Sequence, residues 1–159
     1  LVVEVLYNTE QNQKRIAGAL AAMWKQVLGV RAKLLNQEWK VFLENRKRKV
    51  ITQVFRSGWI GDYNDPYTFS QLMHSKNGQN DPGYSSAEYD RLLDEAAATA
   101  DPAHRRMLLE AAERRLLADQ PLIPLFFYAS KRLVKPWVGG YQPNIMDHHH
   151  TKDLHILSH

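Results

Sequence analysis

Apolar and polar positions alternate along the first third of the chain in a way that predicts strands and helices in turn. Residues 1–7 are rich in β-branched side chains and predict a strand. The next stretch carries apolar side chains at helical spacing, with Thr9 as the expected N-cap and Gly29 as the expected end. A second strand, a second helix and a third strand follow at residues 30–35, 37–47 and 51–56. This β-α-β-α-β order predicts a parallel sheet of the α/β class.

Helices are predicted for the middle of the chain. Residues 67–74 favour a short helix, and residues 75–83 contain the glycine, asparagine and proline typical of a loop. Two antiparallel helices then follow, the first capped by Ser85 and the second running over residues 102–119 from an Asp101 cap.

The last quarter has a different pattern. Residues 122–129 are apolar, and Pro124 within them favours a strand at a sheet edge. From Val134 the amphipathic period is lost, and only residues 154–157 form another short strand-like run.

Composition narrows the class of protein without identifying it. The 159 residues include 44% hydrophobic and 24% charged residues and no cysteine, which suits one globular domain without disulfides or thiolate chemistry. The net charge of +4 is mild. The dense basic run at residues 46–49 is interpreted as a solvated helix end, so we expect no nucleic-acid partner. Because the sequence starts with Leu1 inside a strand-like run, we expect a piece of a longer protein and take no compartment from the missing leader.

Catalytic and metal-binding signatures are weak. No Gly-x-Ser-x-Gly or phosphate-loop motif occurs, so neither an enzyme nor a cofactor is expected. His148, His149 and His150 are consecutive, and in extended backbone such neighbours point in alternate directions. We therefore expect no native metal site there.

The stretch from Arg56 to Pro66 is the strongest candidate for a binding site. Two glycines follow the third strand, bracket Trp59 and precede the carboxylate of Asp62. Glycine lets another backbone approach closely, and ligands of open α/β sheets gather where strands end. The alternative is structural: turn glycines, a rim tryptophan and an aspartate that caps the next turn.

Nearby side chains would complete a site for a molecule with charges of both signs. The aromatic, cationic and anionic candidates are Trp39, Arg46, Arg56, Trp59 and Asp62. Arginine offers forked donors to a carboxylate, and an aspartate accepts from an ammonium. These are the groups needed to hold a short peptide by both ends, with strand-edge pairing along its backbone.

Three separated motifs, at residues 36–39, 56–66 and 132–141, resemble the periplasmic oligopeptide-binding proteins of bacterial ABC importers. The resemblance covers the whole chain but only the C-terminal part of such a protein. It implies that residues 1–134 are part of one lobe of a type II-like periplasmic binding protein: the parallel β-α-β-α-β unit, the helical pair and a further strand. Residues 135–159 would be a tail that returns to the other lobe.

The resemblance also implies roles for single residues. Asp62 would hold the peptide ammonium, and the backbone at Ser57, Gly58 and Trp59 would pair with the peptide main chain. The remaining candidates, Trp39, Arg46 and Arg56, would line side-chain pockets or meet the carboxylate end.

The function implied is capture of short peptides in the periplasm for delivery to a membrane permease. A truncated lobe that serves as a dimerising interaction module outside transport is the alternative. Since the final strand would lack its neighbours from the other lobe, the sequence also predicts a tail that is either disordered or exchanged with a second copy.

Overall fold

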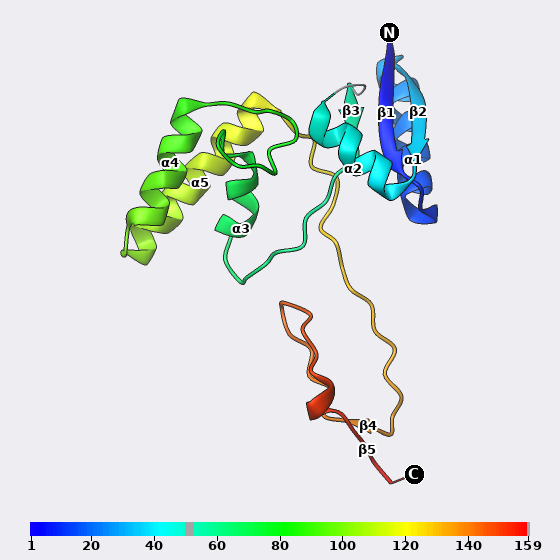
Figure 1. Cartoon of the computed structure of the whole chain (residues 1–159), viewed down its shortest axis with the longest axis vertical. Helices are drawn as coiled ribbons and strands as arrows, with labels where there is room; N and C mark the ends of the chain where they lie inside the picture. Colours follow the sequence, from blue (N-terminus) through cyan, green and yellow to red (C-terminus); the bar gives the residue numbers. More distant parts are fainter. Residues whose placement is uncertain (50–52, 159) are drawn as a thin grey trace. The chain divides into compact units, whose positions relative to one another are not determined.

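The computed structural model describes residues 1–49 and 53–158 (Figure 1). The chain forms two compact units, which are described separately. The first comprises Leu1–Ile60 and Leu72–Asp90, and the second comprises Gly61–Gln71 and Arg91–His159. No helix in the described part of the chain is both long and apolar enough to cross a membrane.

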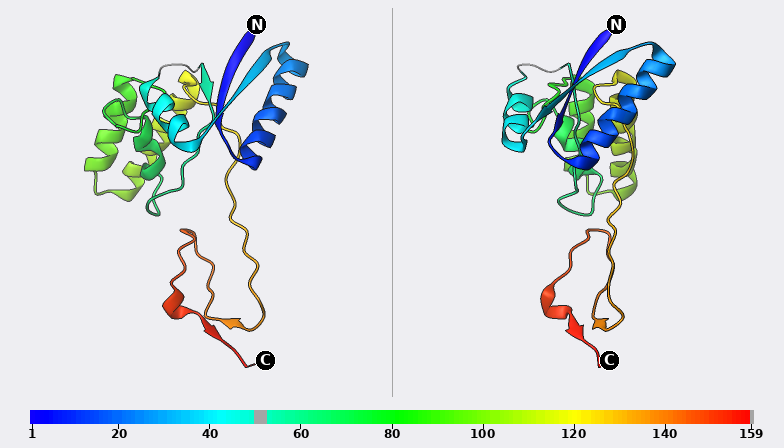
Figure 2. Two further views of the ribbon diagram at one scale, coloured as in Figure 1. Left: turned by 45° about the vertical axis from the view of Figure 1, so that its right-hand side comes forward. Right: turned by 90° about the vertical axis from the view of Figure 1, so that its right-hand side faces the viewer.

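A three-stranded parallel sheet organises the first unit and confirms the α/β prediction. Its elements are β1 (Val2–Asn8), α1 (Gln11–Leu28), β2 (Arg31–Gln37), α2 (Trp39–Arg48) and β3 (Val54–Phe55). The strand order is β2-β1-β3, and both pairings are parallel. The two helices lie on opposite sides of the sheet (Figures 1 and 2). Accordingly, Val5 and Leu6 of the central strand are buried, as is Phe42 of α2.

Local signals placed the ends of α1 to within a residue. Gly29 has φ 66° and its N–H donates to the Trp24 carbonyl, as predicted for a glycine C-cap. The N-cap is Glu10 rather than Thr9, since the Glu10 carboxylate accepts from the Asn12 and Gln13 N–H groups. The Thr9 hydroxyl instead donates to Asn36 at 2.8 Å.

The third strand is shorter than predicted, because β3 begins at Val54. Ile51 and Thr52, which the sequence assigned to this strand, lie outside the described residues. The Arg56 N–H continues the pairing by donating to the Leu6 carbonyl at 2.8 Å.

Helices dominate residues 67–119. They are α3 (Tyr67–Ser70), the 3-10 turn η1 (Gln71–Met73), α4 (Ala87–Ala98) and α5 (Pro102–Asp119). The long helices α4 and α5 run side by side, as predicted (Figures 1 and 2). The residues buried along them are Tyr89, Leu92, Leu93 and Ala96 of α4 and Leu108, Leu109, Ala112 and Leu116 of α5. Asp101 caps α5 as expected, whereas α4 is capped by Ser86, whose hydroxyl accepts from the Tyr89 N–H, and not by Ser85.

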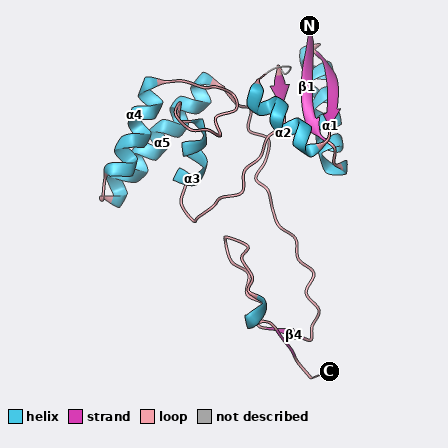
Figure 3. Ribbon diagram, viewed as in Figure 1, coloured by secondary structure: helices cyan, strands magenta, loops and turns pink. Residues whose placement is uncertain are grey.

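The predicted strand at residues 122–129 is wrong, because this segment has no regular structure (Figure 3). Pro121 and Pro124 remove two backbone donors, and no neighbouring strand pairs with residues 122–129. Phe127 is fully exposed there.

The final strand, in contrast, is present and paired. The antiparallel partners are β4 (Val138–Gly139) and β5 (His155–Ile156), and η2 (Thr151–Asp153) precedes β5. The last strand therefore finds its neighbour in its own chain. β5 is paired with β4 along one of its edges, and nothing supports a dimer formed through this tail.

Candidate ligand-binding site

The predicted site residues are distributed over both units. Trp39, Arg46, Arg56, Ser57, Gly58 and Trp59 belong to the first unit, and Asp62 belongs to the second. Two groups of side chains can therefore be described, each within one unit. We call Phe42, Arg46, Phe55, Ser57 and Asp81 the arginine cluster, and Asp62, Asp65, Thr68 and Arg105 the aspartate turn.

The arginine cluster holds one guanidinium in a largely dry environment. The Arg46 side chain, on the last turn of α2, is 14% exposed and forms an ion pair through Nε with the Asp81 carboxylate, itself 10% exposed. Arg46 Nη1 donates to Ser57 Oγ at 3.4 Å. The guanidinium carbon lies 5.4 Å from the ring centre of Phe42 and 5.7 Å from that of Phe55. Aromatic faces attract cations, so these rings and Asp81 together stabilise the charge.

This geometry corrects the interpretation of the basic run at residues 46–49. Lys47, Arg48 and Lys49 are exposed, as a solvated helix end requires, but Arg46 is not. The sequence could not show the difference, because the counter-charge comes from a distant loop. Periodicity places a residue on a helix face, but it does not identify a partner far along the chain.

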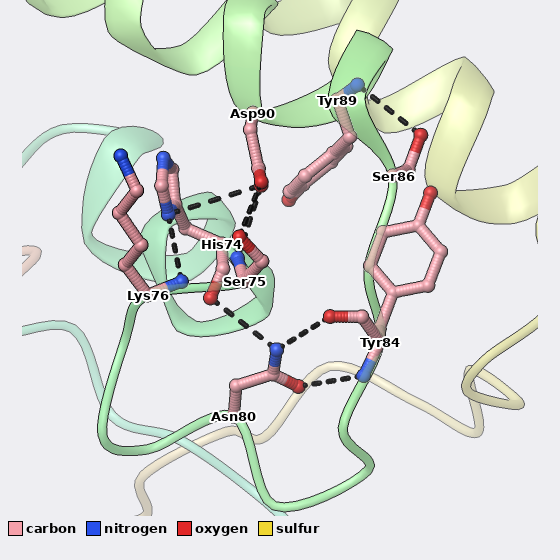
Figure 4. A network of polar contacts seen from close by, with 8 residues as sticks. All are labelled: His74, Ser75, Lys76, Asn80, Tyr84, Ser86, Tyr89 and Asp90. Atoms are coloured by element: carbon pink, nitrogen blue, oxygen red, sulfur yellow. Dashed lines mark hydrogen bonds and ion pairs between the residues drawn. The ribbon is translucent and has the colours of Figure 1, made fainter.

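The loop that supplies Asp81 is ordered by its own hydrogen bonds (Figure 4). Asn80 is 7% exposed, and its amide donates to the carbonyls of His74 (3.3 Å) and Tyr84 (2.7 Å). Its side-chain oxygen accepts from the Tyr84 N–H at 3.0 Å, so one amide holds both ends of the turn. The high turn content predicted this loop, but not that Asn80 and Asp81 would be buried.

A second contact fixes the start of the same loop. The N–H and the hydroxyl of Ser75 both donate to the Asp90 carboxylate (Figure 4). Burial alone raises the pKa of Asp90, but the Ser75 hydrogen bonds and the neighbouring His74 outweigh it, and the pKa is lowered overall. The loop is therefore held at both ends.

The other predicted residues of the first unit surround the arginine cluster or the strand end. Trp39 is half exposed and stacks on Phe42, with ring centres 5.8 Å apart. Gly58 leaves room for the Arg56 guanidinium, since a Cβ at this glycine would lie 3.3 Å from Arg56 Nη1. Trp59 is 37% exposed.

An open, polar hollow of about 410 Å³ lies on the first unit, and Asp81 of the arginine cluster is among the residues that line it. It is lined by Lys47, Lys49 and loop residues between Ser75 and Ser85. None of the predicted site residues lines it, and we assign it no role.

The aspartate turn contains two carboxylates in different states. Asp65 accepts from Arg105 Nη1 at 2.6 Å and Nη2 at 2.9 Å, and from the Tyr67 N–H at 2.8 Å. The Arg105 hydrogen bonds, opposed by partial burial, hold the pKa of Asp65 below its usual range. Asp65 is therefore neutralised by an internal arginine and accepts from a backbone N–H at the start of α3.

Asp62 is placed differently. Its side chain is exposed, its N–H donates to Thr68 Oγ at 3.0 Å, and the Thr68 hydroxyl donates to Asp62 Oδ2 at 3.3 Å. Within residues 1–49 and 53–158, no lysine, arginine or histidine forms an ion pair with Asp62. The Tyr67 N–H at the start of α3 donates to Asp65 and not to Asp62. The structural alternative, an aspartate that holds the next turn, remains compatible with the hydrogen bonds between Asp62 and Thr68. The Asp62 carboxylate is thus oriented by a hydroxyl and exposed to solvent.

One histidine of the run at residues 148–150 is held by other contacts. His149 stacks on Tyr141 with ring centres 4.6 Å apart and contacts Asp147 at 2.8 Å. Among the described residues, no three histidine, aspartate or glutamate side chains are grouped as metal ligands.

Comparisons with known proteins extend these observations. The sequence profile of the bacterial extracellular solute-binding proteins, family 5 (middle region), matches residues 1–81. The chain is 39% identical to the periplasmic oligopeptide-binding protein OppA of Escherichia coli, over all of this chain and 29% of that protein. It is 38% identical to the periplasmic murein peptide-binding protein MppA of the same organism, over all of this chain and 30% of that protein.

Solved structures of such proteins also match the fold of this chain. That of Haemophilus influenzae OppA in complex with RPPGFSPFR matches with a TM-score of 0.89 and 37% identity, covering 99% of this chain and 31% of that one. The structure of the E. coli murein tripeptide-binding protein MppA gives a TM-score of 0.90 at 38% identity. The chain thus spans 29 to 31% of the length of these relatives.

Proposed function

The chain belongs to family 5 of the bacterial extracellular solute-binding proteins, and from that premise we propose that it contributes to the periplasmic capture of short peptides for an ABC importer. The observation that carries the proposal is Asp62, an exposed carboxylate with an oriented hydrogen-bond donor and no cationic partner among the described residues. A peptide's α-ammonium would supply the missing charge. Relatives named as periplasmic peptide-binding proteins give the proposal its ligand class and compartment.

The backbone after β3 would provide contacts that do not depend on the sequence of the peptide. Backbone at Ser57, Gly58 and Trp59 follows β3, and glycine there permits close approach of another main chain. Pairing of backbone N–H and carbonyl groups gives affinity without depending on side chains.

Side-chain contacts would come from Trp39, Arg46 and Arg56. Trp39 offers a half-exposed ring. Because Arg46 is already paired with Asp81, it would meet a ligand carboxylate as one half of an ion pair and not as a free cation. Residues 135–159 would connect to the rest of the binding protein, and the membrane permease would be a partner of the whole protein. We propose no catalytic role.

The 159-residue chain alone should bind peptides weakly. Full enclosure buries most of a ligand, whereas part of a site provides fewer contacts and still pays the entropy of association. We expect a dissociation constant of about 1 mM or weaker.

Titration of the ¹⁵N-labelled chain with trialanine, followed by NMR, tests the proposal. Amide shifts should move at Asp62 and at residues 57–59, and N-acetyl-trialanine should produce much smaller changes at Asp62. An Asp62→Asn variant is the matched control and should respond alike to the two peptides. Equal responses of the unsubstituted chain to both peptides would refute the ammonium role, and micromolar affinity would refute the weak binding.

A non-transport interaction module is the alternative function. It predicts that the chain self-associates and ignores peptides. Light scattering at the NMR concentration separates the two, since the proposed function expects a monomer that responds to trialanine.

A further inference from the structure

Thr68 is buried, whereas Asp62, to which it is hydrogen-bonded, is exposed. Thr68 has no solvent exposure, whereas Asn80 and Asp81, which are also buried in the described part of the chain, are 7% and 9% exposed. Its hydroxyl oxygen lies 3.0 Å from the Asp62 backbone nitrogen and 3.3 Å from Asp62 Oδ2. Both hydrogen bonds connect this buried group to one exposed residue.

The direction of these hydrogen bonds follows from the chemistry of a hydroxyl group. A threonine hydroxyl has one proton to donate and lone pairs to accept with. The Asp62 N–H can only donate, so it occupies a lone pair of the oxygen. The hydroxyl proton is then directed to the carboxylate, which as an anion can only accept. The Asp62 side chain is thereby tied to its own backbone through Thr68.

The surroundings keep Thr68 in place. A Cβ at Gly61 would lie 3.1 Å from the Phe69 ring and 3.2 Å from Thr68 Cγ2, so the backbone before Asp62 packs directly on α3. The start of α3 is fixed in turn by Asp65, which accepts from the Tyr67 N–H and from both terminal nitrogens of Arg105. Thr68 is therefore rigidly held, while Asp62 itself has no other side-chain support in the described part of the chain.

We propose that Thr68 is a positioning residue, which orients the Asp62 carboxylate for a ligand's ammonium group. This inference rests on the proposed function. A carboxylate already held in its binding orientation loses less conformational freedom when a ligand arrives. The hydroxyl is not expected to touch the ligand, because it is fully buried.

The test compares two substitutions, one that removes the hydroxyl and one that keeps it. Thr68→Val keeps the branched shape and removes the hydroxyl, and Thr68→Ser keeps the hydroxyl. Dissociation constants for trialanine and N-acetyl-trialanine are measured by NMR for both variants, for the unsubstituted chain and for Asp62→Asn. Thr68→Val should reduce the preference for the free amine roughly threefold to tenfold, the value of one hydrogen bond, while Thr68→Ser should retain most of it.

The outcomes separate this inference from the proposed function. If Asp62→Asn keeps the preference for the free amine, the proposed function fails. If Asp62→Asn abolishes the preference and Thr68→Val leaves it unchanged, the role of Thr68 alone is refuted. Equal weakening of both peptides by Thr68→Val would show a merely structural role and would also refute it.

A second measurement needs no ligand. Hydrogen exchange of the Asp62 amide should be faster in Thr68→Val than in Thr68→Ser, because only the latter retains the acceptor. Unchanged exchange would overturn the geometry on which the inference rests. Should Thr68→Val fail to fold, Thr68→Ala takes its place in both measurements.

Discussion

The arginine cluster and the aspartate turn both surround a charged residue that the sequence predicted to bind ligand, yet the two charges are treated in opposite ways. Arg46 is 14% exposed and paired with Asp81. Asp62 is exposed and contacts a neutral hydroxyl, with no counter-charge in the described residues. The charge of Arg46 is paired inside the fold, whereas the charge of Asp62 has no ionic partner in the described residues.

The difference is between a charge that is paired inside the fold and a charge that remains in water. A charge taken out of water must be paired internally, because its desolvation is expensive. A charge that remains in water can be oriented by neutral donors without being cancelled. Asp65 makes the same point three residues from Asp62: Arg105 neutralises it, and it serves the fold.

The largest effect should come from removing the partner of Arg46. Asp81→Ala leaves a mostly buried guanidinium without its counter-charge, which should lower the free energy of unfolding by about 3–5 kcal/mol in urea denaturation. Lys47→Ala, on the exposed side of the same helix end, is the control and should change it by less than about 0.5 kcal/mol. A loss below about 1 kcal/mol for Asp81→Ala would contradict the structural role of the pair.

A double variant sharpens the same point. Replacing both members by apolar residues of similar size, Arg46→Met with Asp81→Leu, removes the desolvation cost together with the attraction. We expect it to recover most of the stability that Asp81→Ala loses. If the double variant is as unstable as Asp81→Ala, the loss of stability comes from packing and not from the unpaired charge.

A smaller effect on binding is expected at Asp62. Asp62→Asn should weaken binding of free-amine peptides by about 1.5–3 kcal/mol, the value of a hydrogen bond to a charged group. The free energy of unfolding should stay within about 0.5 kcal/mol of the original, because the side chain is exposed. A marked loss of stability would place Asp62 with the structural charges, and the contrast with Arg46 would fail.

A smaller effect is expected on the acid dependence of stability, through the pair of Asp65 with Arg105. Its pKa is lower in the folded chain than in the unfolded one, so its contribution is present above the ordinary carboxyl range and is lost as pH falls through the lowered pKa. With side chains 28% exposed, the pair with Arg105 should contribute about 1 kcal/mol. Arg105→Met should lower the free energy of unfolding at neutral pH. Below pH about 4, that free energy should decline less steeply in the variant than in the unsubstituted chain. An unchanged acid profile would show that the pair contributes nothing.

The smallest effect is expected on the outer face of α5. Glu110 lies 2.7 Å from Arg106 and 3.9 Å from Arg114, and all three side chains are well exposed. Solvent and salt screen such pairs. Glu110→Gln should leave the urea midpoint unchanged within error, and a clear shift would mean that exposed ion pairs matter more here than the comparison assumes.

The parts of the fold that the sequence predicted are those specified locally. Apolar periodicity, Gly29 and the Asp101 cap each act within a few residues, and all were confirmed. Segment 122–129 failed because a strand needs a partner, and its apolar composition carries no information about one. The N-caps of α1 and α4 were missed by one residue, since adjacent polar side chains compete for the same N–H groups.

In the candidate site, too, the sequence indicated local features and missed contacts between distant residues. The sequence pointed to Asp62 through its glycines and its place after a strand. It did not indicate that Thr68 would orient Asp62, or that Asp81 would neutralise Arg46. Both depend on contacts made only after folding, and a threonine at the start of a short helix gives no signal of its own.

The loop that carries Asp81 also limits how long a sample of this protein stays chemically uniform. Asn77 is followed by Gly78, and a Cβ at that glycine would meet nothing within 4 Å. The backbone nitrogen of the glycine can attack the side-chain carbonyl carbon of the asparagine, which releases ammonia and forms a cyclic imide. Water then opens the imide to aspartate or to its backbone-shifted isomer, slowly, on storage. Aged preparations should therefore contain a more acidic species altered within the turn that Asn80 holds closed.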